Sequence, residues 1–447
     1  MKETQLQIFL PGVPKAKQGR DVPQKWAWTE ASVWTERMVA TLERGIKGGK
    51  WFSLVDRIWK MENLQSAAAQ VQANGGAAGV DGLSCEAYLK DSALRLQRLQ
   101  TKLQQDNYRP QPVKRVWIPK LGSKELRPLG VPTVEDRIVQ TALRNGIEPI
   151  FENIFAEHSY GFRPGKGAKD ALRRVDQLLK AGRVWVVDAD LKAYFDTIPQ
   201  EPLMRLVEEQ IADSRVLELI GKMLKQGVME TAKEWQPTEK GTPQGAVISP
   251  LLANLYLNPL DHLMVGSGKE MVRYADDFVI LCESQAEAEE VLEQLRQWTR
   301  AAGLALHPVK TRIVDANQKG GFDFLGYHFE RGHRWPREKS MGKLRETIRQ
   351  KTRWRDPRPL NQIITDVNRT SRGWFNYFQH SVANVFARED KWIRQRLRTI
   401  LRRRHKGQGR ARGRDHQRWP NAYFAELGLF SLAIARAEAS HVRYRTH

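Results

Sequence analysis

Two adjacent carboxylates interrupt an apolar stretch of the chain. In "MVRYADDFVILCE" (271–283), Asp276 and Asp277 stand between strand-forming residues such as Val272 and Phe278. An ionised carboxylate near a hydrophobic core is costly, because it loses its hydration. A bound cation would offset this cost, so the pattern indicates metal chemistry. The alternative is a hairpin turn whose aspartates bond their own backbone.

A second stretch, "RVWVVDADLKAYFDTI" (183–198), carries further carboxylates. Two such strands side by side could bring Asp190 together with Asp276 and Asp277, although strand alternation does not choose between Asp188 and Asp190. Carboxylates that share a site repel one another unless a cation neutralises them. Oxygen ligands of this kind favour Mg²⁺, with Mn²⁺ as a substitute, and a pair of such ions stabilises both oxygens of a phosphoryl displacement. The sequence therefore predicts nucleotidyl transfer.

The elements that must position these carboxylates are also visible in the sequence. The segment "GTPQGAVISPLLANLYLNPLD" (241–261) is a Gly/Pro turn followed by an apolar helix. We expect further helices near 201–226 and 284–302, and the clearest strands of the chain lie within 181–330. The C-terminal part is helical and basic, and "KGQGRARGRD" (406–415) predicts a loop.

Composition and charge indicate a folded protein with an anionic partner. The chain has 447 residues, of which 41% are hydrophobic and 28% charged, which is typical of folded protein in several domains. The net charge is +22, and residues 331–420 hold 26 Lys and Arg against 7 Asp and Glu. Aromatic residues such as Trp354 and Trp392 lie within this basic region. The mixture predicts binding to nucleic acid, with a solvated basic face as the alternative.

Several classes of protein are disfavoured. The 2 cysteines, Cys85 and Cys282, lack the spacing of a metal site, and no apolar run is long enough for a membrane span. We therefore expect neither a disulfide framework nor a zinc ribbon, no membrane partner, and a soluble protein of a bacterial-type cytosol. The sequence shows no recognisable dimer face and leaves the oligomeric state open.

The order of these segments resembles the palm of reverse transcriptases: a carboxylate strand, a Pro-Gln-Gly turn with its helix, and a Tyr-Ala-Asp-Asp hairpin. Over roughly residues 25–435 the chain resembles the group II intron-encoded reverse transcriptase/maturase family. The motifs that carry this resemblance are "GVDG" (79–82), "RPLGVPTVEDRIVQTAL" (127–143), "SYGFRPGKGAKDAL" (159–172), "HPVKTRIVD" (307–315), "FDFLGYHF" (322–329) and "RGWFNYF" (372–378).

The resemblance implies an α+β right-hand polymerase fold. We expect an N-terminal extension (1–60), fingers (61–180), a mixed-sheet palm with the catalytic core (181–330), and a helical thumb/maturase (X) domain with a basic tail (331–447). It also implies RNA-directed DNA polymerisation from dNTPs with Mg²⁺, on an RNA template with a DNA or RNA primer. Binding of group II intron RNA would assist splicing, and mobility would involve target DNA.

Two alternatives stay open at this point. One is an RNA-binding maturase scaffold in which polymerase activity is secondary or lost. The other is a domesticated reverse transcriptase that serves DNA repair or phage defence. Many relatives carry a zinc-containing endonuclease domain after the thumb. Because the end of this sequence has no Cys pairs, we expect no DNA-cleaving activity of its own.

The resemblance assigns the metal ligands and part of the nucleotide site. Asp190, Asp276 and Asp277 match the metal-binding aspartates, and the family pattern chooses Asp190 because an aromatic pair follows it at the expected distance. Phe195 matches the aromatic residue beneath the incoming sugar, which excludes a 2′-hydroxyl. A core position is the alternative for Phe195, and Tyr194 beside it could take either role.

Further positions match the family's nucleotide-binding residues. Gln244 matches a residue that lies against nucleotide and template, with a turn-stabilising amide as the alternative. Lys120 and Arg127 match positions that contact the triphosphate, for which a solvated basic hairpin is the alternative. Arg163 is a candidate for template phosphate. Lys310 resembles the palm lysine that is sometimes assigned as the acid protonating the departing pyrophosphate.

Overall fold

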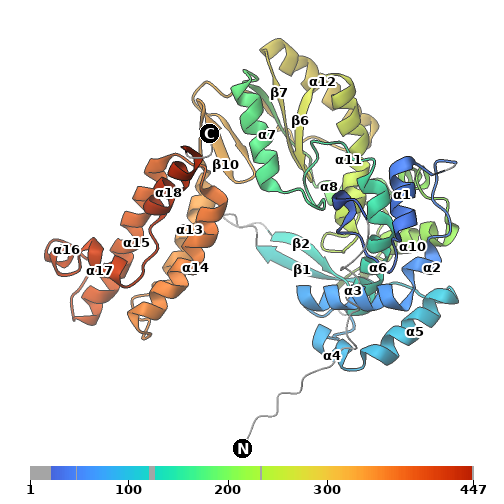
Figure 1. The fold of residues 1–447 in the computed structure, drawn as a ribbon, viewed down its shortest axis with the longest axis horizontal. Helices are drawn as coiled ribbons and strands as arrows, with labels where there is room; N and C mark the ends of the chain where they lie inside the picture. The colour runs from blue at the N-terminus through green and yellow to red at the C-terminus, as the bar shows by residue number, and fades with distance from the viewer. Residues whose placement is uncertain (1–21, 47, 120–125, 232–233, 445–447) are drawn as a thin grey trace, which may run out of the picture.

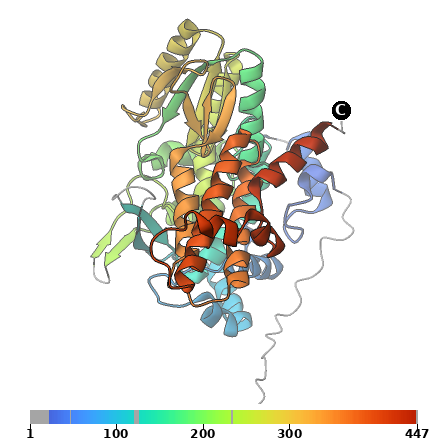
Figure 2. The ribbon, with the colours of Figure 1, turned by 90° about the vertical axis from the view of Figure 1, so that its left-hand side faces the viewer.

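The computed structural model describes residues 22–46, 48–119, 126–231 and 234–444 (Figure 1). The helices of the C-terminal region, drawn in orange and red, form an arm on one side of the molecule, which faces the viewer in Figure 2. The N-terminal helices pack on the opposite side, and the main sheet lies at one end of the molecule, above them in the view of Figure 1. Within the described residues, no helix is both long and apolar enough to cross a bilayer.

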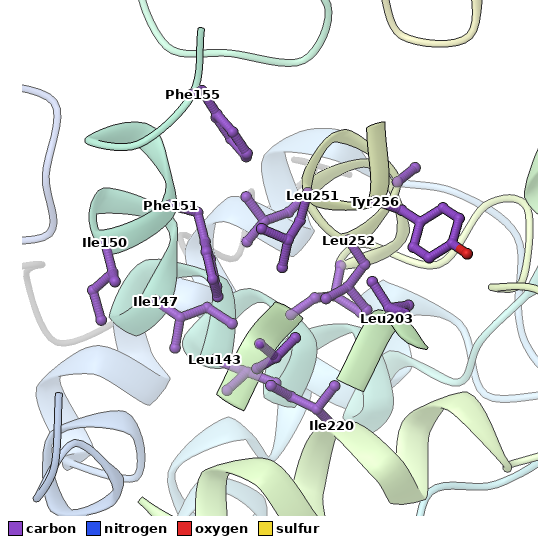
Figure 3. Packing of buried hydrophobic residues seen from close by; sticks show 14 of the residues in the cluster. Leu143, Ile147, Ile150, Phe151, Phe155, Leu203, Ile220, Leu251, Leu252 and Tyr256 are labelled. Carbon is purple, nitrogen blue, oxygen red and sulfur yellow. The ribbon is translucent and has the colours of Figure 1, made fainter. Parts of the chain in front are cut away.

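The N-terminal region is helical and is built around one buried helix. Its helices are α1 (Glu36–Arg44), α2 (Val55–Ile58), α3 (Met61–Asn74), α4 (Cys85–Lys90), α5 (Ser92–Gln104) and α6 (Val134–Glu152). Most residues of α6 are buried, because α2, α3 and later helices pack around it. Figure 3 shows Phe151 of α6 facing Leu251 of α11 (Ser249–Gly266), within the largest hydrophobic core.

A small sheet lies beside this helical region. Its strands are β1 (Val113–Pro119), β2 (Leu126–Val131), β4 (Val228–Thr231) and β5 (Glu234–Gln236), in the order β2-β1-β4-β5. Strands β1 and β2 pair in antiparallel fashion, whereas β1 and β4 run parallel. Two strands from the segment expected to be palm thus join the sheet formed by the expected fingers.

The main sheet carries the carboxylate segments. Its strands are β3 (Trp185–Asp190), β6 (Glu270–Tyr274), β7 (Asp277–Cys282) and β8 (Arg312–Asp315), in the antiparallel order β6-β7-β3-β8. The expected pairing of the two carboxylate strands is therefore confirmed. The helices of this region are α7 (Ala168–Lys180), α8 (Tyr194–Thr197), α9 (Gln200–Glu208), α10 (Ser214–Leu224), α11, and α12 (Gln285–Ala301).

Strand alternation gives the main sheet two apolar faces. Val187 and Ile280 face the large core, and α12 packs against β3 and β7. Val186 and Val279 face a second core that includes α7 residues. Since residues two apart share a face, Asp188 lies on the side of this second core, where the apolar pattern of β3 ends.

The C-terminal region combines a three-stranded sheet with helices. The strands are β9 (Phe322–Phe324), β10 (Tyr327–Glu330) and β11 (His333–Pro336), and the helices are α13 (Glu338–Lys351), α14 (Leu360–Phe378), α15 (Ala383–Arg404), α16 (Arg414–Arg418), α17 (Asn421–Glu426) and α18 (Leu432–Tyr444). Ile348, Ile364 and Phe386 are among the residues of a third core that holds these helices together. The loop predicted for 406–415 is confirmed as far as residue 413, and its last two residues begin α16.

Candidate active site

The carboxylates meet at one end of the main sheet. Asp190, the last residue of β3, lies directly opposite Asp277, the first residue of β7. Strands β6 and β7 form a hairpin in which Tyr274 pairs with Asp277, so Ala275 and Asp276 make a two-residue turn. Ala275 has a φ of 59°, the left-handed region that a tight hairpin turn requires.

The electrostatics of this cluster favour a cation. Loss of hydration, followed by the charge of Asp190, raises the pKa of Asp276 above its ordinary value. Surrounding protein atoms, and then the carboxylates of Asp188 and Asp276, raise the pKa of Asp277 to about 7. Asp277 is nevertheless exposed in its strand, so water reaches it. A cation can therefore reach Asp277 from solvent, and binding would remove the repulsion between the like charges.

Two basic residues reach the carboxylates from the segment before β8 and from β8 itself. Lys310 Nζ donates a hydrogen bond of 2.7 Å to Asp190 Oδ2. Arg312 Nε lies 3.4 Å from Asp188 Oδ2. Burial, opposed by Arg312, raises the pKa of Asp188 to about 6. The lysine that sequence reasoning singled out thus contacts one of the candidate metal ligands.

The chemistry of the donor set fits a hard divalent cation. Asp190, Asp276 and Asp277 offer oxygen atoms alone, which is the ligand set that Mg²⁺ prefers. Within the described ranges, no group of three His, Cys, Asp or Glu side chains is already arranged to hold a metal ion. Because an ammonium group neutralises Asp190 in this structure, the side chains would have to adjust when an ion binds.

A buried ionic network between β6 and α11 supports the carboxylate turn. The Arg273 side chain is 0% exposed and forms an ion pair with Asp261 of α11. It also donates hydrogen bonds of 2.9 Å to Asn254 Oδ1 and to the carbonyl oxygen of Ala275. Gly161 packs against the same turn, where a Cβ would collide with the backbone nitrogen of Ala275. The position of the turn is therefore set by α11 and by the segment around Gly161.

A cavity of about 350 Å³ adjoins the small sheet, and several expected nucleotide-site residues lie in or near it. Phe195, Asp196 and Gln244 line this cavity. Arg127 Nε donates to Gln244 Oε1 at 2.9 Å, and Gln244 Nε2 donates to Asp196 Oδ2 at 3.2 Å. The positive charge of Arg127 also lowers the pKa of Asp276, against the raising effect of burial. Arg127 thus contacts a residue that lines the cavity and acts through its charge on a carboxylate of the hairpin.

The structure distinguishes between the two neighbouring aromatics. Tyr194 is 3% exposed, and its hydroxyl donates a hydrogen bond of 2.6 Å to the carbonyl oxygen of Ala253 in the core. Phe195 is 9% exposed and lines the cavity. Phe195 is therefore the member of the pair that a ligand in the cavity would meet.

Arg163 and Lys120 are two other expected phosphate contacts. The expectation that Arg163 contacts template phosphate is wrong for this structure, because the side chain is 4% exposed and ion-paired to Glu152. It also donates hydrogen bonds to the carbonyl oxygens of Ala156 and Ser159, so its donors are largely taken up by the protein. Lys120 and the expected turn at Leu121–Lys124 lie outside the described residues.

Some residues near the carboxylates were not identified from the sequence. Arg337, just before α13, lowers the pKa of Asp277 through its charge. Tyr377 of α14 has its pKa raised to about 12 by burial and then by the neighbouring Tyr274 and Asp277. No local motif connects these residues to the carboxylates, because they follow in the chain by at least 60 residues and only folding brings them near.

Comparison with known proteins identifies the two parts of the chain. Residues 118–329 match the family described as reverse transcriptase (RNA-dependent DNA polymerase), and residues 341–419 match the group II intron, maturase-specific domain. Protein YkfC of Escherichia coli (strain K12) is 34% identical over 345 residues, which cover 68% of this chain and 86% of YkfC. The group II intron-encoded protein LtrA of Lactococcus lactis subsp. cremoris is 39% identical over 191 residues, or 41% of this chain and 31% of LtrA.

The chain is thus a reverse transcriptase domain followed by a maturase-specific domain, with the α+β right-hand fold that the sequence predicted. It belongs to the group II intron-encoded reverse transcriptase/maturase family. Among solved structures, a partial Cas6-RT-Cas1–Cas2 complex matches with a TM-score of 0.36 and 23% identity, covering 55% of this chain and 42% of that chain. Telomerase from Candida albicans matches with a TM-score of 0.41 and 13% identity, covering 71% of this chain and 63% of that chain.

Proposed function

We propose that the carboxylate hairpin carries out RNA-directed DNA polymerisation and that the C-terminal helices bind a group II intron RNA. The observation that supports the reaction best is the direct cross-strand pairing of Asp190 with Asp277, with Asp276 in the adjoining turn. Burial, and then the charges of neighbouring carboxylates, raise the pKa of Asp276 and of Asp277, and a catalytic cation would remove that repulsion.

In this proposal Asp190, Asp276 and Asp277 hold two Mg²⁺ ions, which Mn²⁺ could replace. The bound ions would stabilise the attacking and leaving oxygens of an in-line phosphoryl displacement. Lys310 keeps Asp190 neutralised before the ions arrive, through its 2.7 Å contact with Oδ2. We further propose that Lys310 then serves as the acid for the departing pyrophosphate. If Lys310→Leu leaves the pH–rate profile of polymerisation unaltered, this role is wrong.

We propose that the cavity beside the hairpin receives the dNTP. Phe195 would lie under the sugar, and its ring leaves no room for a 2′-hydroxyl. Gln244 is oriented by Arg127 at 2.9 Å and by Asp196 at 3.2 Å, so its amide is already fixed before nucleotide binds. Arg127, together with Lys120 outside the described residues, would bind the triphosphate, for which the arginine fork is suited.

The maturase part of the proposal concerns RNA. The match of residues 341–419 to the maturase-specific domain and the basic excess of residues 331–420 support binding of intron RNA by this region. If the intron is mobile, the protein would also bind the target DNA. The domain division into an extension (1–60), fingers (61–180), palm (181–330) and thumb/maturase domain (331–447) remains part of the proposal.

The experiment is primer extension on a generic RNA template with Mg²⁺, comparing the wild type with Asp276→Asn/Asp277→Asn. Asparagine keeps the shape of aspartate and removes its charge. We expect the wild type to make cDNA and the double variant to make none. If neither protein makes cDNA while both promote splicing of the cognate intron, the protein is an RNA-binding scaffold. Intron RNA domains flanking the gene would separate a mobile protein from a domesticated one.

A further inference from the structure

Phe162 combines two unfavourable features beside the active site. Its side chain is 53% exposed to solvent. Its φ is 56°, in the left-handed region, where a bulky side chain is uncommon and carries a conformational cost. Single exposed apolar residues are normal on protein surfaces. An exposed aromatic residue in a costly backbone conformation requires that the surrounding structure hold it there, and such strain concentrates at functional sites.

Both neighbours of Phe162 are locked in place. Gly161 lies against the backbone of the carboxylate turn, and Asn254 Nδ2 donates a hydrogen bond of 2.7 Å to its carbonyl oxygen. Arg163 is anchored by its buried ion pair with Glu152 and by hydrogen bonds to two carbonyl oxygens of the same segment. The chain therefore turns sharply between two fixed points, and Phe162 is the residue left projecting outward.

The ring of Phe162 lies next to the residues that bear the chemistry. Its centroid is 6.3 Å from that of Tyr274, the residue that opens the carboxylate turn, and the two rings are tilted by 41°. The preceding residues, Ser159 and Tyr160, follow the edge strand β6 through a bridge to Arg273. Phe162 and Tyr274 thus form an aromatic pair between solvent and the residue that opens the carboxylate turn.

We propose that Phe162 is a stacking contact for the nucleic acid at the active site. Its ligand is the flat face of a base or sugar, in either the template or the primer, close to the point of synthesis. Aromatic side chains hold single nucleotides in this way without reading their sequence. This inference rests on the proposed polymerase function, because it takes the primer–template as the ligand of the carboxylate site.

The test is a binding titration of the full-length protein with an RNA template–DNA primer, without nucleotides. A single 2-aminopurine, whose fluorescence falls on stacking, is placed in turn at each position near the primer end of either strand. The variants are Phe162→Ala, Phe162→Leu, which keeps bulk without a flat ring, and Phe162→Trp, which keeps the ring. The matched control is Phe52→Ala, because Phe52 is 61% exposed, lies between α1 and α2, and is not among the residues that line the cavity.

We expect Phe162→Ala to raise Kd about tenfold, within the range that loss of one base–aromatic contact produces. Phe162→Ala and Phe162→Leu should restore the fluorescence of 2-aminopurine at one position, and Phe162→Trp should keep it low. The strand that carries this position identifies the ligand as template or primer. Phe52→Ala should behave as the wild type, and equal melting temperatures would show that the variants are folded.

The proposal is overturned if Phe162→Ala binds with the wild-type Kd and leaves the fluorescence unchanged at every position. It is also overturned if Phe52→Ala weakens binding equally, or if the wild type does not bind the primer–template. A failure of the polymerase proposal would give a different result. A wild-type protein that shows Phe162-dependent stacking, yet extends no primer after dNTPs and Mg²⁺ are added, would contradict the polymerase proposal alone.

Discussion

Asp188 and Asp190 stand two residues apart on the same face of β3, yet their surroundings differ. The side chain of Asp188 is 19% exposed and is paired with Arg312, a residue of the neighbouring strand β8. Asp190 is 40% exposed at the end of its strand, opposite Asp277. The strand end thus leaves Asp190 more open to a ligand from solvent than Asp188, whose carboxylate is held by Arg312. This difference in position favours Asp190 over Asp188 as the candidate metal ligand, a choice that strand alternation leaves open.

We predict that Asp190→Asn lowers the rate of primer extension by about a hundredfold or more, the usual cost of losing a group that stabilises charge in the reaction. Asp188→Asn should lower the rate far less, because Asp188 is expected to position β8 through Arg312 and not to bind metal. Single-turnover extension at saturating primer–template measures both. Comparable losses of rate in the two variants would mean that Asp188 also acts in the reaction.

Glu148 offers a pH dependence that lies outside the carboxylate site. Burial in α6, opposed by Arg144 at 3.6 Å, raises the pKa of Glu148 to about 7. The folded protein therefore binds a proton that the unfolded chain has already lost, so stability falls as pH rises from about 4.5 to 7. The side chain is 15% exposed, and above pH 7 the loss in free energy of unfolding is about 3 kcal/mol.

Glu148→Gln should accordingly be more stable than the wild type at pH 8 and close to it at pH 5. Urea unfolding at a series of pH values measures the difference in free energy of unfolding, with Glu86→Gln at an exposed position as the control. A difference between Glu148→Gln and the wild type that stays constant from pH 5 to pH 8 would contradict the assignment.

At the scale of elements, the position of the carboxylate turn depends on Arg273, whose charged side chain is fully buried. Arg273 connects β6 to α11 through Asp261 and connects both to the turn through the carbonyl oxygen of Ala275. We predict that Arg273→Met lowers the free energy of unfolding by about 3–5 kcal/mol, because it leaves the buried carboxylate of Asp261 without its partner. Arg312→Met, which breaks a more exposed pair, should cost about 1 kcal/mol or less. Similar losses measured by denaturant unfolding would contradict this distinction.

The elements that sequence predicted are those with local patterns. Strand-forming apolar residues identified the segment 271–283, and alternation identified the segment 183–198. The turn before α11 was visible from its Gly and Pro residues. The region 201–226, predicted as helical, contains two helices. The second, α10, starts anew after Asp213, whose side chain caps its first turn. Pairing of β4 with β1 was not predicted, because nothing in a short strand specifies a partner more than a hundred residues away.

The prediction for Arg163 failed for a related reason. Its motif places an arginine beside glycines, a composition that suits phosphate binding as well as it suits a buried anchor. Only the fold shows that Glu152, at the end of α6, enters the same enclosed space and takes the guanidinium. The partner of a charged residue is a nonlocal property, so candidate phosphate contacts are the part of the site that sequence predicts least securely.

At the scale of the whole molecule, the C-terminal aromatics divide into two roles that composition could not separate. Phe375 and Phe386 are buried in the third core. Trp354 is 48% exposed and has the guanidinium groups of Arg355 and Arg403 at 4.4 Å and 4.9 Å from its ring. Some aromatic residues pack between the helices, and only the aromatic residues that stay exposed at the surface can contact a ligand.

The basic surface itself predicts how binding should respond to salt. Lys406, Arg410 and Arg414 are exposed between α15 and the start of α16, and none forms an ion pair within the described residues. Each one that neutralises a phosphate should contribute about 0.7–0.9 to the slope of log K against log salt, so replacing all three with glutamine should flatten that slope by about 2.

The control replaces three lysines that already form ion pairs: Lys102, Lys222 and Lys269. Titration of intron RNA at several salt concentrations gives both slopes. If the control flattens the slope as much as the loop variant does, the affinity comes from net charge and not from this surface.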